Sequence, residues 1–171
     1  MSAADHLDHA LRAVGFPEDD PELSRTPQLV TAMWAEFAPQ PVPPVQPLPT
    51  ESTDLVVLRE LPFYSLCAHH LLPFFGTCTL AVRPDGAVAG FGWYPRVLSA
   101  LSRRPQLQER LADQLAHAIL DGIGARSVGV RIRARQLCME MRGARSAGEI
   151  EVVALRGADD AAVEAAVSRR L

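Results

Sequence analysis

Lysine is absent from this chain of 171 residues, and all 17 of its basic residues are arginine. The absence excludes reactions that need a lysine amine, such as Schiff-base aldol chemistry, pyridoxal-phosphate chemistry and phosphate binding by a lysine-bearing loop. No apolar run reaches about 18 residues, so the sequence predicts no membrane span. The formal net charge of −3 provides no basic field that would recruit nucleic acid or an anionic membrane.

Cysteine is also scarce, with three residues. The N-terminus has no basic segment followed by a long apolar core, which is the pattern of an export signal. An odd number of cysteines without such a signal favours a reducing compartment, where thiols serve as ligands or nucleophiles more often than as disulfides. The length suits one globular domain. We therefore expect a cytoplasmic, single-domain protein.

Hydrophobic periodicity and proline divide the chain into three segments. An N-terminal helical segment, 1–38, carries two helical patterns, and the apolar stripe of the second is typical of a core or subunit contact. Six prolines within 39–49 predict an extended connector over 39–54. The rest, 55–171, mixes strands and helices in an order that predicts an α+β layer with a mostly antiparallel sheet. Strands are expected over 55–58, 75–83, 87–91, 128–138 and 150–155, and a hairpin joins the second strand to the third. Helices are expected over 4–14, 95–102, 105–121 and 159–171. A further helix is expected to follow Thr26 as its N-cap, and Gly122 is expected to end the helix over 105–121.

The densest cluster of chemically active residues is Cys67-Ala68-His69-His70. Cys67 and His70 are three residues apart, so a turn can bring them together, and thiolate and imidazole are ligands suited to zinc. Cys138, expected on the inward face of its strand, is the best third donor. Three such ligands leave one tetrahedral position to water, whose pKa zinc lowers to about 7, and His69 would be free as a general acid or base. The spacing alone equally allows buried thiols and histidines that satisfy backbone carbonyls.

Further candidates lie near helix starts and polar turns. Glu109 is either a first-turn acid favoured by the helix dipole or a bidentate acceptor for an amidine-like edge such as that of guanine. Arg96 and Arg142 could bind phosphate, although a solvated charged face is the more common role. Cys78, in the middle of a strand, is expected to be a small buried side chain.

Three segments, in the same order along the chain, resemble motifs of GTP cyclohydrolase I. Residues 63–74 resemble its zinc motif, 106–111 its guanine-binding segment and 137–143 its second zinc motif. The resemblance implies the tunnelling fold, in which sheets of several subunits join into a barrel with active sites at subunit interfaces, and a homodecamer. The family reaction opens the imidazole ring of GTP at carbon 8, releases formate and closes dihydroneopterin triphosphate. The residues that the resemblance assigns are Cys67, His70 and Cys138 for zinc, His69 for proton transfer at nitrogen 7 and carbon 8, Gln108 and Glu109 for guanine, and Arg96 and Arg142 for the phosphates.

The sequence departs from the family pattern at several positions. Gln136 stands where the family has a histidine two residues before the ligand cysteine, and a glutamine side chain does not titrate. Gly92 and Trp93 replace a serine and a lysine that serve the sugar and the triphosphate, and Ala68 replaces a glutamate. We therefore predict an enzyme that opens the ring of a guanine nucleotide but stops at a formamidopyrimidine or a diaminopyrimidine.

Three other functions are compatible with the sequence. The chain could carry out the ordinary GTP cyclohydrolase I reaction if another group relays the proton. It could be a related tunnelling-fold enzyme that acts on a less phosphorylated substrate, because Trp93 replaces a phosphate-binding lysine. It could also be a non-catalytic, zinc-containing ring protein that binds a pterin or a partner. The product formed from GTP separates the first from an early stop, turnover of mono- and triphosphates tests the second, and His69→Ala tests the third.

Overall fold

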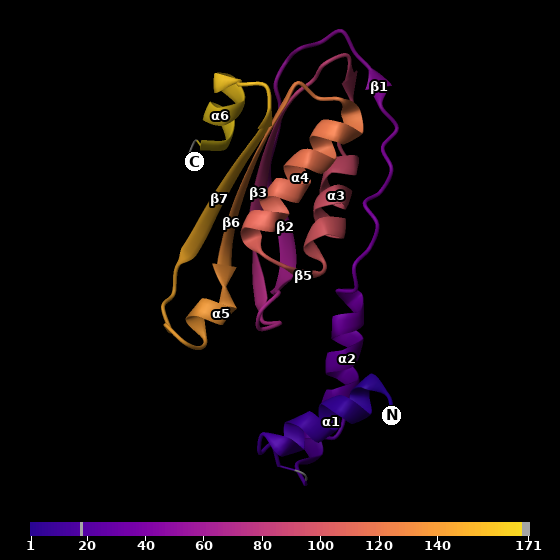
Figure 1. Ribbon diagram of the computed structural model, residues 1–171, viewed down its shortest axis with the longest axis vertical. Coiled ribbons are helices and arrows are strands. Elements are labelled where there is room, and N and C mark those ends of the chain that lie inside the picture. The colour runs from indigo at the N-terminus through magenta and orange to yellow at the C-terminus, as the bar shows by residue number, and fades with distance from the viewer. Residues whose placement is uncertain (18, 169–171) are drawn as a thin grey trace. The chain divides into compact units, whose positions relative to one another are not determined.

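The computed structural model describes residues 1–17 and 19–168, and the chain divides into two compact units, one up to Ala38 and one from Pro39 on. Among the described residues, no helix is both long enough and apolar enough to cross a membrane. The larger unit carries the sheet, and Figure 1 labels its helices and strands.

The smaller unit is helical, as the sequence predicts. Ser2 caps its first helix through a reciprocal pair of hydrogen bonds with Asp5, which satisfies two backbone donors that the helix leaves free. The second helix begins at Thr26 itself and not after it, because Arg25 takes the cap position without a side-chain bond. The apolar stripe of this helix is not a core within the unit, since Leu29 and Met33 are 58% and 39% exposed. The elements are α1 (Ala3–Ala13), the 3-10 turn η1 (Pro21–Leu23) and α2 (Thr26–Glu36).

The larger unit is built on one five-stranded sheet, and its class is α+β as predicted. The strand order is β5-β2-β3-β6-β7, and every pair is antiparallel except the short parallel contact of β5 with β2. The proline-rich segment from Pro39 remains outside this sheet, because proline has no backbone donor for a ladder. The strands of this sheet are β2 (Val56–Cys67), β3 (Pro73–Arg83), β5 (Pro105–Gln106), β6 (Ser127–Gln136) and β7 (Glu149–Gly157).

The main core lies between the sheet and two helices that cover one of its faces (Figure 1). These helices are α3 (Trp93–Ser102) and α4 (Gln108–Ile123). On β6 the predicted alternation holds, because Val128, Val130, Ile132 and Ala134 are fully buried in this core. The last helix, α6 (Ala161–Ser168), packs Val163 and Val167 on Ala81, on the opposite face.

Several predicted element boundaries are wrong, and two of them affect the topology. β2 runs far beyond residue 58, because a register shift between Leu58 and Leu61, with Glu60 at φ +54°, carries the pairing past the polar residues. The predicted hairpin over 75–91 does not form: β4 (Ala87–Val88) pairs with β1 (Leu48–Pro49) in a separate two-stranded sheet.

The predicted bounds of the helices also need correction. The helix expected from residue 105 begins at Gln108, because Pro105 and Gln106 pair with β2. It passes Gly122 and ends at Ile123, where Gly124 adopts the left-handed conformation (φ +63°) that favours glycine. The helix expected over 95–102 begins two residues earlier, at Trp93. The end of the predicted helix over 159–171 lies outside the described residues.

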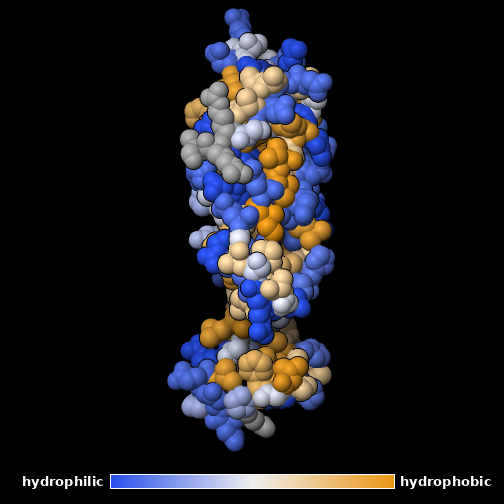
Figure 2. All heavy atoms as spheres, turned by 90° about the vertical axis from the view of Figure 1, so that its left-hand side faces the viewer, coloured by the Kyte–Doolittle hydropathy of each residue, from blue (hydrophilic) through white to orange (hydrophobic). Residues whose placement is uncertain are grey.

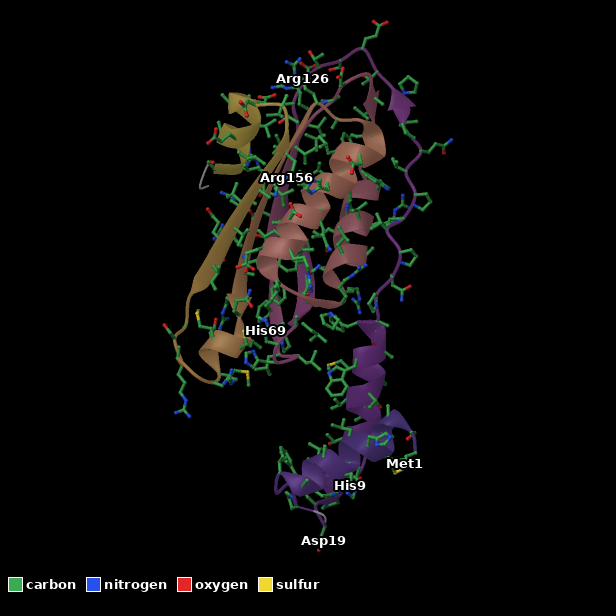
Figure 3. The ribbon with its side chains drawn as sticks, viewed as in Figure 1. Met1, His9, Asp19, His69, Arg126 and Arg156 are labelled. Atoms are coloured by element: carbon green, nitrogen blue, oxygen red, sulfur yellow. The ribbon has the colours of Figure 1, made fainter. Side chains whose placement is uncertain are left out.

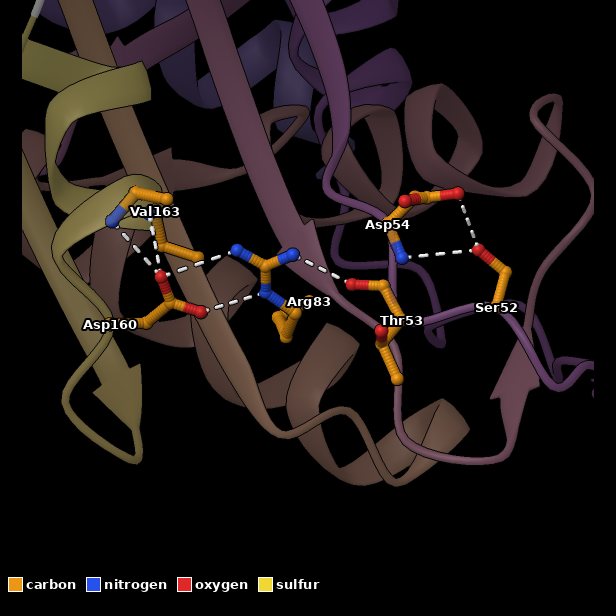
Figure 4. A network of polar contacts seen from close by, with 7 residues as sticks. Ser52, Thr53, Asp54, Arg83, Asp160 and Val163 are labelled. Carbon is orange, nitrogen blue, oxygen red and sulfur yellow. Dashed lines mark hydrogen bonds and ion pairs between the residues drawn. The ribbon is translucent and has the colours of Figure 1, made fainter.

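A polar network ties α6 to the sheet at the end of β3 (Figure 4). The Arg83 guanidinium donates from Nε to Asp160 Oδ2 at 2.8 Å and from Nη1 to the Thr53 carbonyl at 2.6 Å. Asp160 Oδ1 also accepts from the backbone amides of Ala162 and Val163 at the start of α6. These bonds favour the ionised carboxylate, and chiefly the bond from Arg83 lowers the pKa of Asp160 from 3.8 to about 2.

Asp160→Ala is expected to lower the free energy of unfolding by about 1–2 kcal/mol at pH 7, because it removes both the helix cap and the ion pair. Because the folded pKa is the lower one, the stabilisation is complete above the unfolded pKa of about 3.8 and disappears as the pH falls to about 2. Denaturant unfolding across this range measures the difference. Asp159→Ala, at the exposed neighbouring residue, is the control; an equal loss there, or a difference independent of pH, would contradict the assignment.

Candidate active site

The turn after β2 brings Cys67 and His70 to the same side. The Cys67 carbonyl accepts from the amides of His70 at 3.3 Å and Leu71 at 2.8 Å, and the Cys67 amide donates to the Leu72 carbonyl. Leu71 adopts φ +53° to close the turn. As a result, Cys67 Sγ lies 3.7 Å from His70 Nδ1. The backbone geometry of this turn therefore produces the pairing that the sequence spacing suggested.

Cys138 reaches the same place from a different element. The prediction that it lies on a strand is wrong: β6 ends at Gln136, and Cys138 belongs to the one-turn helix α5 (Leu137–Glu140). The ligand atoms of Cys67, His70 and Cys138 nevertheless lie within 4.8 Å of one another. The change from strand to helix aims the Cys138 thiol at the turn after β2.

The donor set fits a tetrahedral zinc ion. Zinc–sulfur bonds of about 2.3 Å and zinc–nitrogen bonds of about 2.0 Å place ligand atoms about 3.5–3.8 Å apart. The 3.7 Å between Cys67 Sγ and His70 Nδ1 meets this spacing, and the 4.8 Å limit for the whole set requires a contraction of about 1 Å at most. Cys67 is buried, Cys138 is half-buried and His70 is exposed, so the cluster lies at the surface with one side open.

The charges around the cluster act on its thiol and imidazole groups. Burial raises the pKa of the Cys138 thiol, and the neighbouring Cys67 raises it further. Ligation by this thiol therefore requires a metal to displace its proton. Arg142 Nη1 lies 2.5 Å from His70 Nε2, so the free histidine accepts there and its other nitrogen, Nδ1, faces Cys67.

A pocket of about 200 Å³ adjoins the cluster. Cys67 and Cys138 form one end of its lining, and Glu109 lies at the start of α4. His69 is exposed and lines the same pocket, and Figure 3 shows it at the end of the sheet near α5. The pocket therefore combines two thiols, a free imidazole and a carboxylate.

Comparison with known proteins gives this arrangement its context. The sequence profile of GTP cyclohydrolase I matches residues 3–169. The chain is 39% identical to GTP cyclohydrolase 1 of Dehalococcoides mccartyi over 159 residues, which are 88% of the chain and 84% of that protein. It is 45% identical to GTP cyclohydrolase 1 of Campylobacter lari over 109 residues, 63% of the chain and only 57% of that protein's length. The chain belongs to the GTP cyclohydrolase I family.

A solved structure extends the comparison to the fold. The crystal structure of an archaeosine synthase, QueF-Like, in the apo form aligns with a TM-score of 0.52 at 22% identity, over 64% of this chain and all of that one. At this identity the likeness concerns the fold alone. It agrees with the tunnelling fold that the family implies for a single subunit.

Against the family pattern, the pocket differs most at Gln136. Its Nε2 donates to Gln108 Oε1 at 2.8 Å, and Cys138 Sγ lies 3.9 Å from its Oε1. Gln108 Nε2 in turn donates to the backbone carbonyls of Ile132 and Ile150, at 3.0 and 2.9 Å. Gln108 is 3% exposed, and both of its amide hydrogens are used inside the protein. Gln108 therefore lines the pocket with a side chain whose orientation these bonds fix.

The two predicted phosphate-binding arginines lie apart. Arg142 contacts His70, whereas Arg96 lines a separate pocket of about 430 Å³ with Phe91, Trp93 and the proline-rich segment. Trp93, at the family's lysine position, is 4% exposed and donates from its indole nitrogen to the Pro43 carbonyl at 3.0 Å. This side chain anchors the proline-rich segment and does not offer a charge to the solvent.

Several pocket residues escaped the sequence analysis. Gln106 is 1% exposed and bonds to the Leu101 carbonyl and to Gln114, so it supports the start of α4. Leu107, Met139 and Ile150 also line the pocket. A buried glutamine in a polar segment carries no pattern of its own in the sequence, and only the pairing of β5 with β2 places it at the pocket.

Proposed function

We propose that this chain is a zinc-dependent GTP cyclohydrolase I-like hydrolase, acting on a cyclic amidine carbon–nitrogen bond. It opens the imidazole ring of GTP or a related guanine nucleotide at carbon 8 and releases a formamidopyrimidine or a diaminopyrimidine. The observation that carries this proposal is the convergence of Cys67, His70 and Cys138, from two distant segments, beside a pocket that holds His69 and Glu109.

Each residue has a defined task in this proposal. Cys67, His70 and Cys138 hold the zinc ion, which when bound supplies Lewis acidity that makes hydroxide available near neutral pH. His69 moves protons at nitrogen 7 and carbon 8, and Glu109 accepts two parallel donors from the guanine edge. Its neighbour Gln108, which lines the same pocket, is assigned to guanine as well, and the carbonyls of two strands hold its side chain.

Arg142 is the group best placed to change its role when metal binds. A neutral histidine that ligates through Nδ1 carries its proton on Nε2 and can no longer accept a hydrogen bond there. A zinc ion held by His70 would therefore displace the contact of Arg142 with Nε2, and this exposed guanidinium would be available to a phosphate. Arg96 is assigned to the phosphates of the same or a neighbouring subunit's substrate.

The reaction is expected to stop early because family groups are missing, and the structure bears on two of them. Gln136 cannot exchange a proton at neutral pH. The buried indole of Trp93 provides no cation for a triphosphate. The missing groups therefore affect the steps that rearrange the sugar and close the pterin more than they affect the opening of the ring.

Self-association into a ring is part of the proposal, with a homodecamer as the family's usual assembly. Among the described strands, β7 pairs on one side only, with β6. Val153 and Leu155 on β7 are 43% and 40% exposed, and Figure 2 shows hydrophobic side chains in a strip along this side of the larger unit. An open strand edge beside exposed apolar side chains suits pairing with another subunit.

Product analysis tests the proposed function. Zinc-loaded protein is incubated with GTP, GMP and guanosine, and the products are identified by mass spectrometry. We expect ring-opened pyrimidines from the wild type, and a shift toward dihydroneopterin triphosphate from GTP in Gln136→His. Clean formation of dihydroneopterin triphosphate by the wild type would overturn the early stop and support ordinary GTP cyclohydrolase I activity. A metal-loaded protein that binds a pterin but yields no product would support the non-catalytic alternative.

A further inference from the structure

The hydrogen bonds in the wall of the pocket leave the Gln136 amide only one orientation. Gln108 Nε2 faces two backbone carbonyls, those of Ile132 and Ile150. Carbonyl oxygens only accept, so the nitrogen of the Gln108 amide must point at them and its oxygen must point away. That oxygen accepts from Gln136 at 2.8 Å, so the Gln136 amide must present its nitrogen there.

The consequence lies at the other end of the Gln136 amide. Its oxygen faces Cys138, with 3.9 Å between Oε1 and Sγ, and Gln136 lines the pocket. Turning this amide over would set its oxygen against Gln108 Oε1, and turning both amides would set Gln108 Oε1 against two carbonyls. Either rotation places acceptors together in a partly buried site, which is unfavourable.

We propose that Gln136 is a specificity-determining residue whose Oε1 is a fixed, non-titrating acceptor, and that the pocket prefers bases with an N–H donor at position 7 of the purine. This inference rests on the proposed function, in which Glu109 holds the amidine edge and the imidazole edge faces Cys138. Guanine has an unprotonated nitrogen at position 7, whereas a ring-opened formamide carries an N–H on that atom. The fixed acceptor therefore favours the ring-opened state over the intact base.

A pair of unreactive analogues isolates this contact. 9-Deazaguanosine carries N–H at position 7, and 7-deazaguanosine carries C–H there, while both keep the amidine edge for Glu109. Isothermal titration calorimetry of the zinc-loaded protein with each analogue is expected to show about five- to tenfold tighter binding of 9-deazaguanosine, the contribution of one neutral hydrogen bond. In Gln136→Leu this ratio is expected to fall to about one.

The ratio of the two dissociation constants separates recognition from a purely structural effect. Loss of the bond to Gln108 can weaken the binding of both analogues together, but only loss of the acceptor changes the ratio of their dissociation constants. Gln114→Leu is the matched control, because Gln114 accepts from Gln106 at 3.0 Å in the neighbouring amide pair and does not line the pocket. Its ratio should equal that of the wild type.

The possible results distinguish this inference from the proposed function. In one result, both analogues bind, Glu109→Ala weakens the binding of both, and the ratio of dissociation constants is the same in the wild type and in Gln136→Leu. The inference is then wrong and the proposed function stands. If neither analogue binds the wild type, the proposed guanine pocket fails and the inference fails with it. A wild-type preference for 7-deazaguanosine would show that position 136 does not present an acceptor.

Discussion

Cys138→Ala is expected to lower zinc affinity by at least about 100-fold and to abolish ring opening. Mutation of a group that only hydrogen-bonds to a metal ligand already lowers metal affinity by about 10- to 100-fold, and this variant removes one of the three ligands. Metal content of the purified assembly, measured by inductively coupled plasma mass spectrometry, should fall from about one ion per subunit to a small fraction. Activity toward GTP is measured on the same samples.

Cys78→Ala is the matched control for the loss of a thiol. Cys78 is fully buried in the main core, and burial raises the pKa of its thiol, so it is not available as a ligand. This variant should retain its zinc and its activity, with a modest loss of stability. Equal zinc content in Cys138→Ala and Cys78→Ala would disprove the proposed metal centre.

His69→Ala is expected to slow ring opening by about 10²- to 10⁴-fold while leaving zinc content unchanged, because the side chain moves protons without holding the metal. The rate of ring opening with GTP and the zinc content are measured on the same samples.

His117→Ala is the control for the loss of an imidazole. His117 is exposed on α4, with its Nδ1 3.0 Å from the Asp113 carbonyl, and it does not line the pocket. Its rate and zinc content should match those of the wild type. A loss of zinc in His69→Ala would instead assign His69 to the metal, and an unchanged rate would remove it from the proposed chemistry.

The metal cluster shows which features a sequence pattern can predict. The three-residue spacing of Cys67 and His70 predicts that the two side chains lie on the same side of the chain, because a turn at this spacing brings them together. The position of Cys138 was inferred for the wrong reason, since strand alternation was extended past Gln136 into what is a helical turn. The three ligand atoms meet all the same, because antiparallel pairing of β3 with β6 brings Phe74 opposite Gln136 and so places both segments at one end of the sheet.

The hydrogen bonds of Gln108 show what a sequence pattern leaves out. Its place in a family motif predicts contact with guanine, which stays a prediction, and the structure adds that carbonyls of β6 and β7 take both of its amide hydrogens. Those carbonyls belong to residues 24 and 42 positions away. No local pattern records which carbonyls a side chain will meet when three elements pack together.

The sequence by itself determined the α+β class, the family, the three candidate ligands and the alternation of β6, because each depends on residue types at short spacings. Tertiary structure alone decided that β4 pairs with β1, that Trp93 is buried against the proline-rich segment, and that Gln136 presents an oxygen to the pocket. These depend on hydrogen-bond partners distant in the chain, and such a partner is selected only when all the competing donors and acceptors are packed into one buried volume.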